Sequence, residues 1–192
     1  RRLGELGLWA PPPPPLARER TLAILKPDCM RAGACAEVEE FIAAQGFATV
    51  RRRRWRMTSR EAADFLQTSW GSAAGDRDRR FFSEMVAFYA GGEVLALLLE
   101  REGAMTEWRR LLGPGDPAIA RGYTDRFGKA HRARAPLSVR ARWGQNKQAN
   151  AAHGADSYEA AEREIRFVFG EGWGKAGSFP TSDKQTDTHT HT

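Results

Sequence analysis

The chain has 192 residues, of which 41% are hydrophobic and 28% are charged, a composition typical of one soluble globular domain with tails. The longest apolar run, residues 94–99, is far too short to cross a bilayer, so no membrane partner is expected. The formal net charge of +6 favours anionic partners such as nucleotides, RNA or acidic protein surfaces, without choosing among them.

Residues 1–18 are predicted to form a Pro-rich leader. The pentaproline at residues 11–15 favours polyproline II, cannot form a helix and does not suit a secretory signal. Such a leader is either disordered or serves as a docking or spacer segment.

A short apolar run at residues 21–25 stops at Lys26, Pro27 and Asp28. A continuous apolar run that ends at a proline predicts a buried central strand followed by a turn. Lys26 would stand where the strand leaves the core. A lysine there either binds a ligand or only solvates the strand end.

The next predicted elements are a helix that ends at Gly46 and a strand over residues 47–57. Alternation divides its arginine-rich stretch between two faces, with Arg51, Arg53 and Trp55 on one and Arg52, Arg54 and Arg56 on the other. Arginines on both faces indicate an edge strand. Such an edge discourages aggregation, contacts protein, or binds nucleic acid together with the aromatic ring.

The middle of the chain predicts three helices and a second buried strand. A capping box of Thr58 and Glu61 begins a helix that reaches about Trp70, and residues 71–78 follow as a loop. Phe81 opens the next helix, which ends at residues 91–92. Residues 94–99 then form the strand, and a helical stripe over residues 105–112 stops at the following glycine and proline.

Residues 113–137 have little periodicity and are predicted to be a long loop that is functional or partly disordered. The loop is strongly basic, with Arg121, Arg126, Lys129, Arg132 and Arg134. Residues 139–144 are the candidate last strand, and the final helix covers residues 160–169. The histidines near residue 190 are a weak metal candidate, but they fit a disordered tail better. The resulting alternation predicts a small α/β sandwich with helices packed on one sheet.

The stretch over residues 150–157 surrounds His153 with small side chains. Gly154 can aim the imidazole off a turn, and Asp156 or Ser157 is a candidate helix N-cap, with Glu159 as the capping-box partner of Asp156. A neutral imidazole before a helix start can attack a phosphate held by free N–H groups. The alternative is a surface-turn histidine that precedes a helix.

Several stretches together resemble the nucleoside diphosphate kinase family. Residues 19–28 (ERTLAILKPD) are similar to its first strand and KPD signature, and residues 150–157 (NAAHGADS) to its NxxHGxDS signature. Residues 157–165 resemble the helix that follows, and residues 161–169 resemble the divergent ciliary branch, including its radial-spoke members. The resemblance sets a kinase-like domain at residues 19–170 and a flexible polar tail at residues 171–192.

The resemblance implies both a fold and a reaction. The fold would be an α/β (α+β) ferredoxin-like sandwich with a four-stranded antiparallel sheet. The reaction would be ping-pong transfer of the γ-phosphoryl group of a nucleoside triphosphate to a histidine and then to a nucleoside diphosphate. Mg²⁺ would arrive with the nucleotide, so the chain itself needs no metal site.

The same resemblance assigns roles to seven residues. His153 falls on the phosphohistidine and Glu164 on the acid that orients it. The remaining five match nucleotide-binding positions, namely the phosphate cations Lys26, Arg109 and Arg140, the ribose contact Asn150 and the base-stacking Phe81.

The chain also departs from the family pattern. The usual serine two residues after the histidine is Ala155, the arginine before the signature asparagine is Ala149, and the phosphate-contacting threonine aligns with Gly115. Cys29 replaces a glycine, and Trp70 stands near a usual tyrosine. An insertion within residues 118–136 lengthens the loop over the nucleotide site, which is an oligomer contact in the family. These changes remove hydrogen-bonding side chains around the histidine. Such losses would lower the rate of phosphoryl transfer without necessarily abolishing it.

Two functions follow from the resemblance. The first is a nucleoside diphosphate kinase of full or reduced activity, with nucleoside di- and triphosphates as partners. The second is a structural or interaction module, for example of a ciliary axoneme, that keeps nucleotide binding. Nucleic acid is not expected as a partner, and a homo-oligomer or a larger axonemal assembly fits either function. Cys29 and Cys35 match no zinc spacing and are expected to be reduced thiols, which favours the cytoplasm. The resemblance to the ciliary branch adds the cilium or axoneme as a candidate location.

Overall fold

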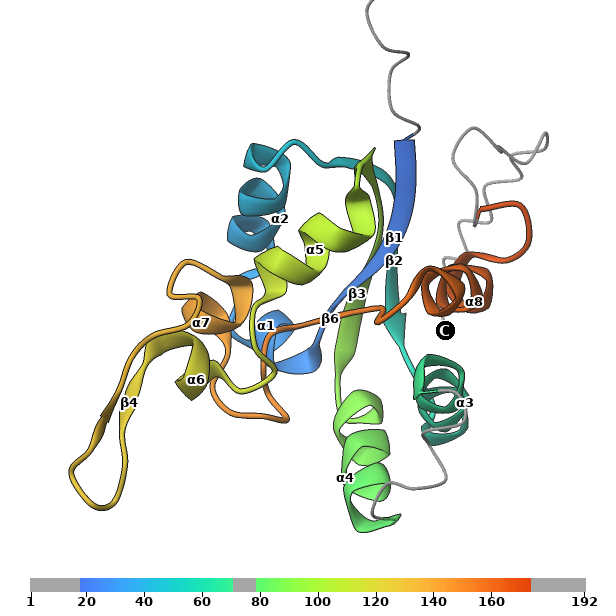
Figure 1. Ribbon diagram of the computed structural model, residues 1–192. Helices are drawn as coiled ribbons and strands as arrows, with labels where there is room; N and C mark the ends of the chain where they lie inside the picture. The colour runs from blue at the N-terminus through green and yellow to red at the C-terminus, as the bar shows by residue number, and fades with distance from the viewer. Residues whose placement is uncertain (1–17, 71–78, 174–192) are drawn as a thin grey trace, which may run out of the picture.

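The computed structural model describes residues 18–70 and 79–173 (Figure 1). Four strands form one sheet in the order β2-β3-β1-β6, with β1 at Arg18–Leu25, β2 at Ala48–Arg56, β3 at Glu93–Glu102 and β6 at Ala152–Gly154. All three pairings are antiparallel. The predicted ferredoxin-like α/β sandwich is confirmed. The leader up to residue 17, the loop at residues 71–78 and the tail from residue 174 lie outside the described residues.

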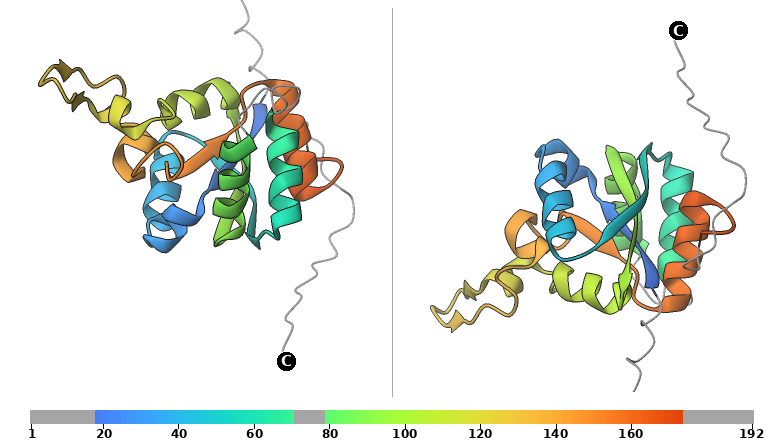
Figure 2. Two further views of the ribbon diagram at one scale, coloured as in Figure 1. Left: turned by 90° about the horizontal axis from the view of Figure 1, so that it is seen from below. Right: turned by 90° about the horizontal axis from the view of Figure 1, so that it is seen from above.

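Alternation along the strands builds a core on each face of the sheet. Leu22 and Ile24 of β1 point to one face, whereas Ala23 and Leu25 point to the other. Helices α2 (Cys35–Ala44) and α5 (Ala104–Leu112) cover the second face, and helices α3 (Ser59–Trp70), α4 (Arg79–Ala90) and α8 (Tyr158–Phe169) cover the first. Figures 1 and 2 show the two helical layers on either side of the sheet. Within the described ranges, no helix is both long and apolar enough to span a membrane.

The arginine-rich strand β2 lies at an edge of the sheet, as predicted. Arg52 pairs with Glu39 of α2 at 2.6 Å on one face. Arg53 lies 4.3 Å from the ring centroid of Trp55 and donates to the Val168 carbonyl at 2.6 Å on the other. The predicted division of the arginines between two faces is therefore confirmed, and these two guanidinium groups tie the edge strand to the helices that cover it.

The predicted capping box is present at the start of α3. The Thr58 N–H donates to Glu61 Oε2 at 2.8 Å, and the Glu61 N–H donates to Thr58 Oγ1 at 3.2 Å. The helix then runs to Trp70, the predicted end. At the other predicted helix end near residue 113, Gly113 has φ of 73°, which favours glycine and stops α5.

The prediction of a last strand at residues 139–144 is wrong. Residues Val139–Trp143 form the short helix α7, and Ser138 caps it by accepting from the Ala141 N–H at 3.3 Å. The fourth strand is β6, which lies inside the stretch predicted to be a turn, with His153 opposite Ile24 of β1. The three residues of β6 are too few to show the alternation of a strand in the sequence. The segment is a strand because it pairs with β1.

Around His153, the prediction for Gly154 differs from the structure, whereas one of the two candidate N-caps is confirmed. The residue with positive φ is Ala151, at 69°, whereas Gly154 is needed because a Cβ there would collide with the indole of Trp108. The N-cap of α8 is Ser157, whose Oγ accepts from the Ala160 N–H at 3.1 Å. Asp156 does not cap the helix with Glu159, and it forms an ion pair with Arg109 instead.

The predicted long loop contains ordered structure. After α6 (Pro117–Arg121), strands β4 (Tyr123–Thr124) and β5 (Ala130–His131) form a hairpin that projects from the body of the molecule (Figures 1 and 2). The rings of Tyr123 and His131 stack at 4.5 Å, and His131 Nε2 lies 3.0 Å from Asp125 Oδ2. Another short helix, α1 (Pro27–Arg31), replaces the predicted turn after β1.

Candidate active site

The carboxyl end of β1, the strand β6 and the helices α3, α4 and α7 surround a cavity of about 280 Å³. Its lining includes five of the predicted site residues, namely Lys26, Phe81, Arg140, Asn150 and His153. The other lining residues are Leu66, Trp70, Met85, Tyr89, Gly115, Lys147 and Ala152. The predicted acid Glu164 lies behind His153, and Arg109 is not among the described residues that line the cavity.

His153 is held from behind by a buried carboxylate. Its Nε2 lies 2.9 Å from Glu164 Oε2, and the side-chain exposures of the two residues are 17% and 0%. The ring also meets the edge of Phe65, with centroids 5.4 Å apart and planes at 81°. A carboxylate accepts the Nε2 proton, which leaves the lone pair of the neutral ring on Nδ1. The geometry therefore presents Nδ1 as the free nitrogen.

The second oxygen of that carboxylate, Glu164 Oε1, is buried and has no hydrogen-bond partner among the residues that the structure describes. Position 155 is an alanine that is 1% exposed and packs with Ala160 and Ala161, which belong to the helix that carries Glu164. An alanine offers no donor, so this end of the carboxylate goes without a stabilising bond.

Lys26 enters the cavity from the end of β1. Its Nζ donates to Asn150 Oδ1 at 2.9 Å and also to the Gln148 carbonyl, and it lies 5.0 Å from the ring centroid of Phe88. Burial lowers the pKa of Lys26 to about 8, although nearby Asp28 opposes this shift. Burial makes it costly to keep the Lys26 ammonium group charged. An anionic ligand beside it would offset that cost, so the position favours an anion.

Arg140 reaches the cavity from the first turn of α7. Its guanidinium donates to the carbonyls of Gly113 at 2.9 Å and Ala152 at 3.3 Å. Burial is the main cause that lowers the pKa of Arg140, and the group stays charged at any ordinary pH because that pKa starts so high. We call the four buried or half-buried polar groups Lys26, Arg140, Asn150 and His153 the floor of the cavity.

We call Trp70 and Phe81, which line the cavity, together with Arg109, which lies outside its lining, the rim. The rings of Trp70 and Phe81 stack, with centroids 5.9 Å apart and an interplanar angle of 11°. Arg109 of α5 donates to the Ala155 carbonyl at 3.2 Å and pairs with the Asp156 carboxylate. Both predicted nucleotide contacts on the rim are therefore engaged with other side chains of the same chain.

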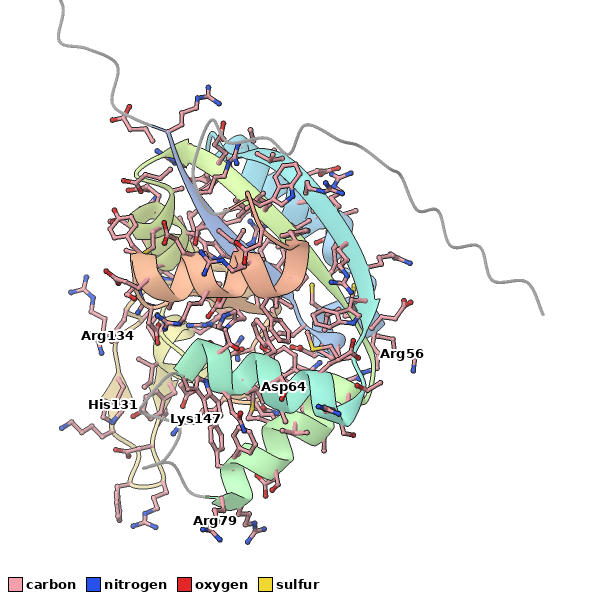
Figure 3. All side chains as sticks on the ribbon, turned by 90° about the vertical axis from the view of Figure 1, so that its right-hand side faces the viewer. Arg56, Asp64, Arg79, His131, Arg134 and Lys147 are labelled. Carbon is pink, nitrogen blue, oxygen red and sulfur yellow. The ribbon has the colours of Figure 1, made fainter. Side chains whose placement is uncertain are left out.

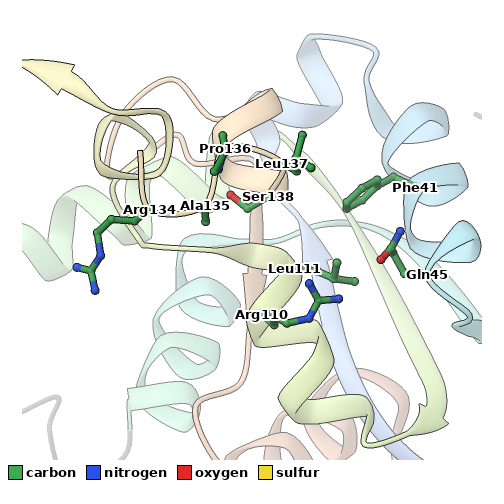
Figure 4. A pocket seen from close by; sticks show the side chains of 9 residues that line it. All are labelled: Phe41, Gln45, Arg110, Leu111, Arg134, Ala135, Pro136, Leu137 and Ser138. Carbon is green, nitrogen blue, oxygen red and sulfur yellow. The ribbon is translucent and has the colours of Figure 1, made fainter. Parts of the chain in front are cut away.

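A larger cavity of about 400 Å³ lies elsewhere, between α2, α5 and the segment before α7 (Figure 4). Its lining is Phe41, Gln45, Arg110, Leu111, Arg134, Ala135, Pro136, Leu137 and Ser138. It contains none of the seven predicted site residues and no carboxylate or imidazole. The smaller cavity with the floor residues is therefore the candidate site, although it is not the larger of the two.

Outside the floor, Lys147 is the charged side chain in the described lining of the cavity. Lys147 lines the cavity and lies 3.8 Å from Asp116. Figure 3 shows Lys147 on the same side of the molecule as His131 and Arg134 of the hairpin region, with Arg56 on the opposite side. A lysine at the border of the cavity favours an anionic ligand there.

Comparisons with known proteins agree with this geometry. The family model described as nucleoside diphosphate kinase matches residues 19–172. The chain belongs to the nucleoside diphosphate kinase family. The nucleoside diphosphate kinase of Aquifex aeolicus is 36% identical over 154 residues, which cover 80% of this chain and 96% of that protein.

Two further relatives are family homologues with longer chains. Human nucleoside diphosphate kinase homolog 5 is 34% identical over 83% of this chain, and rat nucleoside diphosphate kinase homolog 7 is 37% identical over 79% of it. The matched region spans only 66% of the human protein and 33% of the rat protein.

Solved structures of the family show the same fold. A crystal structure of the Aquifex aeolicus kinase has a TM-score of 0.67 and 37% identity, covering 80% of this chain and 96% of that one. The nucleoside diphosphate kinase of Encephalitozoon cuniculi has a TM-score of 0.65, covering 85% of this chain and 94% of that one, and at 24% identity supports the fold alone.

Sequence reasoning missed several residues of this kinase-family cavity. Tyr89 lines it beside Lys26, and Leu66 and Met85 add apolar surface, but their helical periodicity indicated only a core. Lys147 carried a usable signal because it is a basic residue three positions before the signature asparagine. The periodicity of a helix does not show which of its buried residues border a cavity.

Proposed function

We propose that this chain is a nucleoside diphosphate kinase that works through a phosphohistidine at His153. The observation that carries the proposal is the bond between His153 Nε2 and the buried Glu164, at 2.9 Å, which leaves Nδ1 as the free nitrogen of a ring that lines the same cavity as Lys26 and Arg140. A surface-turn histidine would have no buried carboxylate behind it. Membership of the family and the presence of functional kinases among its members support the same conclusion.

The proposed chemistry needs little from the protein except position and charge. Nδ1 of His153 forms a bond to the γ-phosphorus while the bond from that phosphorus to the β,γ-bridging oxygen breaks, and a nucleoside diphosphate leaves. Glu164 stabilises the ring as it gains positive charge. A second nucleoside diphosphate then accepts the phosphoryl group from Nδ1, which restores the neutral imidazole.

The remaining predicted residues would hold the nucleotide. Lys26 and Arg140 are placed to neutralise phosphate oxygens, and Arg109 would join them after it leaves Asp156. Asn150 would contact the ribose, and Phe81 would stack on the base. No group of three or more His, Cys, Asp or Glu within residues 18–70 and 79–173 could hold a metal, so Mg²⁺ would be carried by the nucleotide phosphates, where it neutralises charge.

The direct test of the nucleophile is formation of a phosphoenzyme. We expect incubation with labelled ATP and Mg²⁺ to give an acid-labile, base-stable label on the protein. His153→Ala should remove the label and reduce turnover by at least about 10³-fold, because no other imidazole is among the described residues that line the cavity. The matched control is His131→Ala in the β4–β5 hairpin, which should label normally. A label that persists in His153→Ala would overturn the assignment.

A second function has its own support in the rim. Arg109 is held by Asp156, Phe81 is stacked on Trp70, and Glu164 Oε1 is unsatisfied within the described part of the chain. A nucleotide-binding interaction module would tolerate each of these features. Saturable ATP binding without a phosphohistidine would favour this function, and labelling would exclude it. Oligomer formation, a cytoplasmic or ciliary location and an axonemal assembly are extensions of either proposal.

A further inference from the structure

Three sulfur atoms cluster where α1 meets the start of α2. Cys29 and Met30 belong to α1, and Cys35 is the first residue of α2. The two Sγ atoms are 3.8 Å apart, and Cys35 Sγ lies 3.1 Å from the Met30 sulfur. We call these three residues the sulfur cluster. The proposed phosphoryl transfer makes no use of it.

The backbone between the two cysteines allows them to come closer. A disulfide has an S–S bond of about 2.05 Å, so the two sulfur atoms must approach by less than about 2 Å. The connecting turn contains Gly33, which has φ of +68°, and a Cβ added at this glycine would meet no atom within 4 Å. A turn with this free space can adjust without moving strands β1 or β3.

The two thiols differ in access and in acidity. Cys29 is 1% exposed, whereas Cys35 is partly exposed and open to a small reagent. The contact with Cys29 lowers the pKa of Cys35, although burial opposes this shift, and the same contact together with burial raises the pKa of Cys29. Because Cys35 is the thiol that a small reagent can reach, it reacts first, as the thiolate, and Cys29 is the neighbour that resolves it.

We propose that Cys29 and Cys35 form a reversible dithiol–disulfide modification site for hydroperoxides. In the first step the Cys35 thiolate attacks a peroxide oxygen. An S–O bond forms, the O–O bond breaks and hydroxide or alkoxide leaves, so Cys35 becomes a sulfenic acid. In the second step the Cys29 sulfur attacks the Cys35 sulfur. The S–S bond forms, and the S–O oxygen departs as water with the Cys29 proton.

The sequence between the two cysteines offers a clean test. Trypsin cuts after Arg31, which lies between them, so a disulfide would hold the two tryptic peptides together. We expect hydrogen peroxide to lower the intact mass by two hydrogen atoms and to yield this linked pair. A dithiol reductant should then separate the peptides and restore the mass. Two free thiols after oxidation, a disulfide-linked dimer, or sulfoxide at Met30 alone would each overturn the proposal.

Single variants test the order of the two steps. Cys29→Ser should leave a sulfenic acid on Cys35, which a cyclic diketone probe traps. Cys35→Ser should leave Cys29 unmodified, because that thiol is buried. Equal labelling of both variants would overturn the assigned roles. Met30→Leu is the control for methionine oxidation, and its disulfide should form as in the wild type. Circular dichroism of each variant would verify folding before oxidation.

Discussion

The floor and the rim of the cavity are built in different ways. Lys26, Arg140 and Asn150 on the floor are anchored to backbone carbonyls or to each other, and His153 is anchored to a carboxylate that is fully buried. On the rim, Arg109 is 46% exposed and is bound to an Asp156 that is 77% exposed. The comparison teaches that the floor groups are preorganised, whereas the two rim residues proposed to contact the nucleotide, Arg109 and Phe81, must first release other partners.

Removal of the buried acid is the strongest test of the floor after loss of the nucleophile itself. Glu164→Gln keeps the volume but removes the charge that stabilises the ring as it becomes cationic. We expect the rate of phosphohistidine formation to fall by about 10- to 100-fold, with little change in nucleotide Kd. Single-turnover labelling measures the rate of phosphohistidine formation, and calorimetric titration measures the nucleotide Kd. An unchanged rate would show that the floor does not depend on this carboxylate.

A pH dependence of binding should come from Lys26, whose pKa burial lowers to about 8. Phosphate oxygens favour the charged ammonium, so the bound state holds this proton to higher pH than the free state. Above pH 8 binding then takes up a proton, and affinity falls as pH rises, by up to about tenfold per unit.

Titration of ADP binding between pH 7.5 and 9.5 measures this slope. The Lys26→Arg variant should flatten it because a guanidinium does not titrate in this range. An equally steep slope in that variant would assign the dependence to another group.

On the rim, removal of Asp156 should strengthen nucleotide binding. Asp156→Ala frees Arg109 for phosphate, and an exposed ion pair of this kind is worth about 2- to 5-fold in affinity. Asp64→Ala is the matched control, because Asp64 is an exposed carboxylate on α3 paired with Arg60 and lies away from Arg109. Weaker ADP binding in Asp156→Ala would mean that the carboxylate helps the site rather than holding its arginine back.

The smallest effect is expected from Ala155→Ser. A hydroxyl there could donate to the unsatisfied oxygen of Glu164, and one such bond should raise the rate of phosphohistidine formation by about 2- to 5-fold. Ala161→Ser, in the same alanine cluster, should leave the rate unchanged. A slower enzyme in Ala155→Ser would indicate that the buried space does not accept a hydroxyl.

The sequence predicted the elements whose signals are local. The apolar runs gave β1 and β3, the Thr58 and Glu61 pair gave the start of α3, and the two signatures placed Lys26 and His153 at a common cavity. The proximity of Lys26 and His153 could be predicted because the family motifs are associated with a known fold, whereas composition says nothing about which residues meet. The assigned roles of the seven residues stay predictions until the variants above are measured.

The elements that escaped prediction depend on a distant contact, on a cap that the composition does not reveal, or on strands too short to show a pattern. Strand β6 exists because three residues pair with β1, and α7 exists because Ser138 caps a segment whose composition also suits a strand. The pairing of Arg109 with Asp156 joins residues 47 positions apart, which no spacing rule could reveal. The hairpin was hidden because its strands have only two residues each.

The pairing of β6 with the centre of the sheet has a consequence for hydrogen exchange. The Lys26 amide donates to the Ala151 carbonyl at 2.8 Å, next to a strand that pairs over only three positions, whereas β1 pairs with β3 over eight. Detachment of the short strand would therefore open the Lys26 amide to solvent while the β1–β3 ladder stays closed. Deuterium uptake at this one amide would report how often the nucleophile leaves its place, without any nucleotide present.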